Sequence, residues 1–324
     1  VAGAVVDGQT VVRARRKGLD LSQALQDNDA YPFFEKLHGH IVTGPTGTNV
    51  NDLYLLLALY LLSLSMIPSL ILSVEESRDP SLVGGKAAGL SRLLAAGFAV
   101  PRGLCVPTTV YRHVLAAGGI NAEEVWRRVL QASQEERSQE LARVHACLLK
   151  QAWPTGFQLA LEVRLVELTH DPTIRWAVRS SATNEDVEQA SAAGLYRTSL
   201  GLSSSEILRG ICDCWQSLWS DAAVQYALRT SSSKSFPSMA VVIQPLLQAT
   251  TAGVAYSIHP VTGRTSQVVV NAVPGLAASL VSGEVTPDQY VVEVAEDEGR
   301  PIRIRRRLLA RKVQKLLSTP AGLH

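Results

Sequence analysis

The strongest structural signal in this sequence is a Gly-Gly-Lys turn that runs into an apolar helical repeat. The run VGGKAAGLSRLLAAG covers residues 83–97, and apolar residues such as Ala87, Leu90 and Leu94 recur in it at helical spacing. Lys86 is therefore expected at the start of a helix, where unbonded N–H groups and the helix dipole favour an anion. The pattern predicts a phosphate-binding turn, and the simpler alternative is a turn that only precedes a helix.

A second polar motif, WAVRSSATNED, occupies residues 176–186. Around its start Ile174, Trp176 and Val178 alternate with other residues, which is typical of a strand with two distinct faces. Arg179 is expected on the face opposite to these apolar residues, at the end of the strand and before a polar loop. A guanidinium there can fork onto phosphate oxygens, and the alternative is an ordinary surface ion pair. Together the two motifs predict a site that binds a nucleoside triphosphate.

The composition bears on the size of the fold and on the class of partner. The chain has 324 residues, of which 46% are hydrophobic and 19% charged, enough for two domains or one large one. A net charge of +2 predicts no general attraction to nucleic acid or to anionic membranes. The basic run RPIRIRRRLLARKVQK at 300–315 is expected to form a solvated strand and helix surface, balanced by residues such as Glu293 and Asp297. The alternative for this run is a patch that binds a polyanion.

Four cysteines, Cys105, Cys147, Cys212 and Cys214, are too few and too scattered for a disulfide framework in a chain of this length. They are expected to be reduced, structural thiols rather than metal ligands. The first residues, VAGAVVDG, lack the basic start and the long apolar stretch of a signal peptide. These features predict a cytoplasmic protein.

An uncharged apolar run, LYLLLALYLLSLSMIPSLILSV, extends over residues 53–74 and is long enough to span a bilayer. Pro68 and several serines interrupt it, and no Lys or Arg lies between Lys36 and Arg78 to set an orientation. We therefore expect buried strands, or a helix and a strand, at a domain junction. Residues 70–74 are expected to be the first strand of the domain that follows.

Seven motifs after the junction occur in a characteristic order: GGKAAGL, GFAVPRGLCV, VRSSATNED, AAGLYRTSL, VVIQPLL, GVAYSIHPVTG and VSGEVTPDQYVV. In this order and spacing they resemble the N-terminal ATP-grasp domain of phosphoenolpyruvate synthase and pyruvate phosphate dikinase, a domain that rifampicin phosphotransferases share. The resemblance covers roughly residues 70–310. It implies an α/β (α+β) fold of the ATP-grasp type, in which the nucleotide lies between two sheets.

The first residues resemble a different family. The runs AGAVVDG and TGPTGTNVNDL, within residues 2–53, are similar to the C-terminal end of glycerate 2-kinases of the MOFRL type. The expected organisation is a small α/β fragment of that kinase at 1–60, an apolar junction at 61–74, the ATP-grasp domain at 75–310 and a truncated tail at 311–324. Because most of the kinase is absent from this chain, a glycerate 2-kinase remnant is kept only as a second alternative for the function.

The resemblance assigns roles at the phosphate end of the site to individual residues of this sequence. Lys86 matches the lysine that reaches the phosphates, and Arg179 matches the arginine that clamps them, so these two are the expected catalytic residues. Gly194 and Thr198 match the glycine loop that closes over the phosphates. In that loop Arg197 replaces an aspartate of the family, which adds positive charge and is expected to change the electrostatics of the loop.

At the other end of the nucleotide the resemblance implies an adenine hinge. Gln244, Pro245 and Leu246 match the segment that runs along the edge of the base. Because proline has no N–H group, Leu246 is expected to supply the backbone donor to adenine. The implied cofactors are ATP and Mg²⁺.

The metal position departs from the family pattern. The family has Gly-Leu-Gly-Glu where this chain has GLAA at 275–278, so Ala278 replaces the acidic residue that helps to hold Mg²⁺. Asn271 and Glu284 are the nearest oxygen-bearing substitutes, and the metal ligands remain unassigned. Phosphoryl transfer depends on cations that neutralise the developing charge, so this departure bears directly on turnover.

Two functions from different classes follow from these motifs. The first is ATP binding with phosphoryl transfer, in which the chain is a nucleotide-binding half that acts with a separate phosphohistidine protein and a small acceptor such as pyruvate. The second is a catalytically degenerate nucleotide-binding or interaction module. The intact Lys86 and Arg179 motifs favour the first function, whereas Ala278 and the missing phosphohistidine and pyruvate domains favour the second.

The expected secondary structure follows from periodicity and turn signals. The expected helices are at residues 10–17, 22–26 and 122–151, and the expected strands at 101–106, 239–246, 252–258, 267–272 and 289–294. Short connections between the last four strands predict antiparallel neighbours. Residues 203–206 match a capping box that begins another helix.

Overall fold

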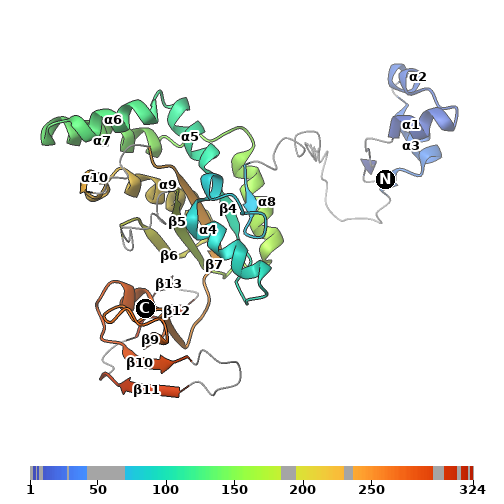
Figure 1. Cartoon of the computed structure of the whole chain (residues 1–324). Coiled ribbons are helices and arrows are strands. Elements are labelled where there is room, and N and C mark those ends of the chain that lie inside the picture. Colours follow the sequence, from blue (N-terminus) through green and yellow to red (C-terminus); the bar gives the residue numbers. More distant parts are fainter. Residues whose placement is uncertain are drawn as a thin grey trace. The chain divides into compact units, whose positions relative to one another are not determined.

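The computed structural model describes residues 3–4, 6, 10–27, 29–41, 70–183, 195–229, 236–294, 303–311, 315–319 and 322–323. The chain divides into two compact units, Val1–Leu59 and Tyr60–His324 (Figure 1). The first unit is small and mainly helical where it is described. The second unit contains two larger antiparallel sheets together with helices, which confirms the expected mixed α/β class.

Three helices and a short ladder make up the described part of the first unit. The elements are β1 (Gly3–Ala4), α1 (Thr10–Arg16), α2 (Leu21–Gln26), α3 (Ala30–Leu37) and β2 (His40–Ile41). β1 and β2 pair antiparallel. Asp20 caps α2, because its carboxylate accepts the backbone N–H groups of Ser22 and Gln23. The helices expected at 10–17 and 22–26 are thus confirmed.

Most of the expected apolar junction falls outside the described residues, which resume at Leu70. The TGPTGTNVNDL loop at 43–53 lies outside them as well. Within the described part of the chain, no helix is both long enough and apolar enough to cross a membrane. The strand expected at 70–74 is present as β3 (Leu72–Ser73), at one edge of the first large sheet.

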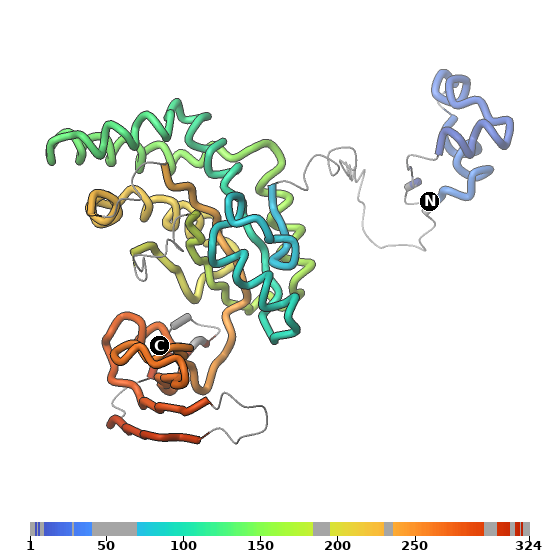
Figure 2. Tube along the Cα trace, in the orientation of Figure 1, coloured from blue at the N-terminus to red at the C-terminus, as the bar shows by residue number. Residues whose placement is uncertain are grey.

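A five-stranded antiparallel sheet forms the centre of the second unit, in the order β3-β4-β7-β5-β6. The remaining strands are β4 (Leu104–Val106), β5 (Trp176–Ala182), β6 (Thr198–Leu202) and β7 (Met239–Pro245). Segments far apart in the sequence therefore run side by side, and the tube in Figure 2 shows this for β4, β5 and β7. β4 confirms the strand expected at 101–106 over its last part.

The two faces of this sheet belong to two different apolar clusters. On one face Cys105, Ala240 and Val242 pack with apolar residues of α4 (Pro80–Ala95). On the other face Trp176 and Val178 belong to a larger core to which six helices contribute. These helices are α5 (Thr108–Ala117), α6 (Ala122–Gln131), α7 (Gln134–Leu149), α8 (Phe157–Leu168), α9 (Ile207–Leu218) and α10 (Asp221–Arg229). Because helices cover both faces of this sheet, β5 and β7 are buried along most of their length.

The single helix expected over 122–151 is wrong, because the chain breaks into α6 and α7 there. The break has a local cause. Ser133 and Glu136 form a capping box, in which the serine hydroxyl accepts the Glu136 N–H group (3.4 Å) and the glutamate carboxylate accepts the Ser133 N–H group (3.0 Å). A new helix therefore starts at Gln134.

A second antiparallel sheet has the order β11-β10-β9-β8. Its strands are β8 (Thr251–Tyr256), β9 (Gln267–Pro274), β10 (Asp288–Glu293) and β11 (Arg303–Leu308), with α11 (Ala278–Val281) between β9 and β10 in sequence. A short pair, β12 (Ser318–Thr319) and β13 (Gly322–Leu323), follows. β11 is exposed along its whole length, as expected for a solvated basic strand.

Four strands, at residues 239–246, 252–258, 267–272 and 289–294, are expected from the sequence to be antiparallel neighbours. This is confirmed for the last three of them, β8, β9 and β10, and wrong for the first, β7. β7 lies between β4 and β5 in the first sheet instead of beside β8. The physical reason is its composition, since a run that is apolar on both faces needs a sheet that is covered on both sides.

Candidate functional site

The Gly-Gly-Lys segment lies inside α4 instead of before it. α4 begins at Pro80, and the Asp79 carboxylate accepts the Ser81 N–H group as an N-cap. Gly84 then interrupts the helix with φ 72° and ψ 170°. The expectation that the helix opens at Lys86 is therefore corrected: helix lies on both sides of a turn at residues 84–86, which we call the 84–86 turn.

Ser181 of β5 ties this turn to the sheet. Its hydroxyl donates a hydrogen bond to the Val83 carbonyl (2.7 Å) and accepts one from the Ala87 N–H group (3.1 Å). Both contacts are buried, and the Ser181 side chain is fully excluded from solvent. A Cβ atom at Gly84 would overlap the backbone carbonyl of Ser181, so only glycine allows this approach. The two sequence motifs singled out above thus meet in the structure.

Arg179 lies on the sheet face that α4 covers. Trp176 and Val178 point into the larger core, and Arg179 and Ser181 alternate with them, so their side chains share the opposite face. The expected face is confirmed, but the expected position at the strand end is wrong. β5 continues to Ala182 because β7 provides an antiparallel partner along its full length.

Thr198 joins this group from the edge strand β6. It is the antiparallel register partner of Arg179, and directly opposed residues of two strands point to the same face. The Thr198 side chain is exposed, whereas Lys86 and Arg179 are half-buried. The structure therefore brings together three of the expected phosphate-end residues, Lys86, Arg179 and Thr198, on one face of the sheet. The fourth, Gly194, lies outside the described residues.

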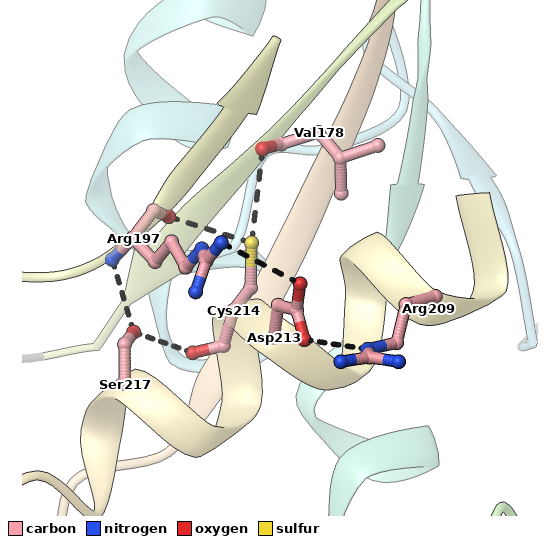
Figure 3. A network of polar contacts seen from close by, with 6 residues as sticks. All are labelled: Val178, Arg197, Arg209, Asp213, Cys214 and Ser217. Carbon is pink, nitrogen blue, oxygen red and sulfur yellow. Dashed lines mark hydrogen bonds and ion pairs between the residues drawn. The ribbon is translucent and has the colours of Figure 1, made fainter. Parts of the chain in front are cut away.

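The Arg197 guanidinium lies beside a carboxylate of α9. Figure 3 shows its guanidinium beside Asp213 of α9, at 3.8 Å, and Asp213 also accepts a hydrogen bond from Arg209 at 3.0 Å. α9 contributes to the core on the sheet face opposite to α4. The loop residues before Leu195 lie outside the described part of the chain, so the expected change in loop electrostatics stays a prediction.

The backbone of Arg197 is anchored to α9 as well (Figure 3). Its N–H group donates to the Ser217 hydroxyl (3.0 Å), and the Cys214 thiol donates to its carbonyl (3.4 Å). Burial raises the pKa of Cys214 to about 12, so the thiol is neutral and acts as a donor. These bonds hold the residue directly before Thr198 and thereby hold the start of β6.

The hinge residues are engaged in bonds within the chain. The buried Gln244 side chain donates to the Pro101 carbonyl (2.8 Å). The Leu246 N–H group, expected to serve adenine, donates to the Arg175 carbonyl (2.7 Å). Pro245 and Leu246 line a cavity of about 240 Å³, together with residues that include Ile174 and Thr319. An adenine base in that cavity would have to bind without the Leu246 N–H group, or break the hydrogen bond that this group donates to the Arg175 carbonyl.

At the metal position that the resemblance implies, the described residues offer no carboxylate. Ala278 is the first residue of α11 and offers no side-chain oxygen. The Asn271 side-chain oxygen accepts a hydrogen bond from Gln289 at 3.2 Å, and Glu284 is exposed. Among the described residues no group of three or more His, Cys, Asp or Glu side chains is placed to hold a metal ion. Mg²⁺ beside a nucleotide is usually held by one or two carboxylates together with phosphate oxygens, so the metal expected from the resemblance stays a prediction.

A comparison with protein families decides the assignment of the second unit. Residues 80–323 match the family described as pyruvate phosphate dikinase, AMP/ATP-binding domain. The chain belongs to this family. Residues 1–52 match the MOFRL family, so the two resemblances noted in the sequence are both confirmed. As a member of the dikinase family the chain carries an ATP-binding domain of proteins that transfer phosphoryl groups.

Relatives of this family domain include proteins with different functions. The chain is 33% identical over 247 residues to a phosphoenolpyruvate synthase of Aeropyrum pernix, a match that covers 74% of this chain and 30% of the relative. It is 33% identical over 243 residues to the prodigiosin synthesizing transferase PigC of Serratia marcescens, with 74% and 26% covered. It is 36% identical over 232 residues to a rifampicin phosphotransferase of a Streptomyces species, with 70% and 26% covered. The chain thus spans less than a third of the length of these relatives.

The sequence motifs of this family domain did not indicate the hydrogen bonds of Ser181 or the helix break at Gly84. A signal for the break was present, because Asp79-Pro80 is a typical helix start and places Gly84 inside the helix. No local signal distinguishes Ser181 from Ser180, since both follow an arginine on an apolar strand. Only the packing of α4 on β5 separates the two hydroxyl groups.

Proposed function

We propose that the second unit binds ATP, with the phosphates on the sheet face that carries Lys86, Arg179 and Thr198. The observation that supports this most strongly is the Ser181 bridge, which brings the 84–86 turn onto the same face as Arg179. Two cationic side chains and a hydroxyl on one face suit a polyphosphate, because ammonium and guanidinium groups donate charge-assisted hydrogen bonds to its oxygens. Membership of a family with an AMP/ATP-binding domain supports the same ligand.

We propose further that the bound ATP donates phosphate in the manner of phosphoenolpyruvate synthase and pyruvate phosphate dikinase. The acceptor is proposed to be a histidine of a separate phosphohistidine protein, with a small molecule such as pyruvate as the final acceptor. The similarity to a phosphoenolpyruvate synthase and to a rifampicin phosphotransferase supports phosphoryl transfer. Lys86 and Arg179 would bind and orient the phosphates. The four unpaired, buried cysteines support a cytoplasmic location.

One observation favours the alternative that the unit binds nucleotide without turnover. Ala278 offers no ligand, and the neighbouring Asn271 oxygen is already bonded to Gln289. Without a carboxylate to hold Mg²⁺, a loaded site would lack a positioned cation against the charge that develops during transfer. The residual glycerate 2-kinase function has no such support in the described residues.

Calorimetric titration of ATP into the whole chain, with and without Mg²⁺, tests the site. We expect micromolar binding that Lys86→Ala and Arg179→Ala each weaken about tenfold, which corresponds to about 1.4 kcal/mol. Arg306→Ala is the control, since it removes an exposed cation of β11 far along the chain from both motifs. A folded wild-type chain that binds no ATP would remove the proposed function.

A turnover assay separates the two candidate functions. The chain that binds ATP is incubated with Mg²⁺ and radiolabelled ATP, with and without a phosphohistidine-domain protein. Label on the partner's histidine supports the phosphotransferase. Binding without any loss of ATP supports the degenerate module and contradicts the transfer step.

A further inference from the structure

Ser181 is the residue that connects the two halves of the candidate site. We infer that Ser181 is a positioning residue, whose hydroxyl holds the 84–86 turn so that Lys86 and Arg179 present their charges to the same ligand. This inference rests on the proposed ATP site and names a residue that acts on it without touching the nucleotide. The supporting observations are a pair of buried hydrogen bonds, a close backbone approach and the shared face of β5.

The hydroxyl substitutes for a helix cap at the break in α4. When a helix restarts after a break, its first N–H groups have no partner within the helix. Ser181 accepts a hydrogen bond from one of them, that of Ala87, and donates a hydrogen bond to the Val83 carbonyl on the other side of the break. The cap therefore comes from a strand 94 residues away from Ala87 in the sequence. A hydroxyl can do this because it is a donor and an acceptor at once.

The carbonyl group of Ser181 holds the same turn by contact. A Cβ atom at Gly84 would overlap this carbonyl oxygen, so the backbone of the turn lies directly on the strand. The hydroxyl and the carbonyl of one residue thus contact both sides of the break. As a result the turn has little room to shift along β5.

This arrangement fixes where the two cations can be. Lys86 lies between Val83 and Ala87, the two residues that Ser181 bonds. Arg179 precedes Ser181 by two residues on the same face, which is about 7 Å along a strand. Two cations at one site repel each other, so a turn that is not held in place would let Lys86 move away from Arg179. Holding the turn before the ligand arrives reduces the ordering that binding must impose.

The neighbouring Ser180 provides a matched control. It is also fully buried, and it follows Arg179 directly on the same strand. Its side chain alternates with that of Ser181 and so points to the other face of the sheet. Its hydroxyl has no hydrogen-bond partner among the described residues. Ser180→Ala therefore removes the same atom from the same strand without affecting the turn.

The test is a set of ATP titrations on the whole chain. The variants are Ser181→Ala, Ser180→Ala, Lys86→Ala and the double variant Ser181→Ala/Lys86→Ala, each first shown to be folded by circular dichroism. We expect Ser181→Ala to weaken ATP binding about tenfold and Ser180→Ala to leave it unchanged. In the Lys86→Ala background the Ser181 substitution should cause no further loss, because coupled residues are non-additive.

The outcomes distinguish this inference from the proposed function. A folded Ser181→Ala variant that binds ATP as tightly as the wild-type chain overturns the positioning role and leaves the proposed ATP site intact. Losses that add fully in the double variant overturn it as well, since they would show that Ser181 does not act through Lys86. Absence of ATP binding by the wild-type chain removes both. If Ser181→Ala does not fold, Ser181→Cys replaces it, with an intermediate loss expected and an unchanged affinity as the contradicting result.

Discussion

Gly84 has the most restricted backbone of the candidate site. Its φ of 72° and ψ of 170° fall in a region that is essentially reserved for glycine. The Ser181 carbonyl also occupies the space that a Cβ atom would need. Two independent effects, backbone strain and overlap, therefore exclude other residues at this position.

Gly84→Ala is expected to lower the free energy of unfolding by about 2 to 4 kcal/mol, from strain and overpacking together. Urea denaturation followed by circular dichroism measures the change. Gly89→Ala is the matched control in the same helix, because Gly89 has ordinary helical geometry and open space around its Cβ position. That variant should gain about 0.5 to 1 kcal/mol. A Gly84→Ala chain as stable as the wild type would contradict the described turn.

At the scale of single residues, the roles of Lys86 and Arg179 at the phosphates stay predictions. The sheet face of Arg179 could be predicted, because an alternating strand is a local pattern. The hinge bonds could not. Leu246 donates to Arg175 and Gln244 donates to Pro101, partners that lie far away along the chain. Nothing in a local pattern indicates that such an N–H group is already used.

A recurring serine–glutamate pair starts several turns and helices of the second unit. In each pair the carboxylate accepts the serine N–H and hydroxyl groups, and the Glu N–H group donates to the serine hydroxyl or to its carbonyl. The pairs are Ser73 with Glu76, Ser133 with Glu136 and Ser203 with Glu206. These bonds lower the pKa of each of the three carboxyl groups.

Glu206→Gln tests this capping by its pH dependence. The Ser203 hydroxyl and N–H groups lower the pKa of Glu206 below 4.5, so the carboxylate stabilises the fold at neutral pH. That contribution is present above the unfolded-state pKa and is lost as the pH falls through the folded-state pKa. We expect a Tm lower than wild type by on the order of 1 to 3 °C at pH 7, and a difference that closes toward pH 3. Thermal melts across this range measure it.

The control for that experiment is Glu162→Gln, which neutralises an exposed glutamate in the interior of α8. Its Tm difference should be small at every pH. A Glu206→Gln difference that stays constant down to pH 3 would contradict the capping explanation, because neutralising the wild-type carboxyl should have the same effect as the substitution.

At the scale of elements, helices and strands were predicted where local signals agree. α1 and α2 follow the expected ranges, whereas the expected long helix at 122–151 is divided by the Ser133 capping box. The box was visible in the sequence as Ser-x-x-Glu but competes with an unbroken helical pattern. Which strand pairs with β7 was not visible, because its run of apolar residues fits any sheet that is covered on both faces.

Across the whole molecule, the four cysteines are all buried and none forms a disulfide, as expected from the sequence. They lie on three elements of the second unit: Cys105 on β4, Cys147 on α7, and Cys212 and Cys214 on α9. Burial raises the pKa of Cys105, Cys212 and Cys214 to about 12 and raises that of Cys147 as well. A thiolate, the reactive form, is therefore scarce in the folded chain at neutral pH.

Thiol labelling tests the packing of the whole second unit. At pH 8 a disulfide reagent that releases a coloured thiol should react slowly with the folded chain, whereas all four cysteines should react at once in urea. The labelling rate of the folded chain should follow the rate of global unfolding, because the reagent reaches the buried thiols only when the core opens. One rapidly labelled cysteine in the folded chain would show that its part of the core is open. If one cysteine is labelled rapidly, a Cys147→Ser variant shows whether that cysteine is Cys147, which lies on α7.

From local sequence patterns and ordered motifs, the two-faced strands, the capping box at residues 203–206 and the family of each unit could be predicted. The strands and the cap depend on residues a few positions apart, where the 2-residue period of strands and the 3.6-residue period of helices act, whereas the family depends on the order and spacing of whole motifs. Three features follow only from the complete fold: β7 lies between β4 and β5, Arg197 pairs with Asp213, and Ser181 instead of Ser180 holds the 84–86 turn. These outcomes depend on burying both faces of a sheet across long connections. Many pairings satisfy the local pattern equally, and the packing of the complete core selects among them.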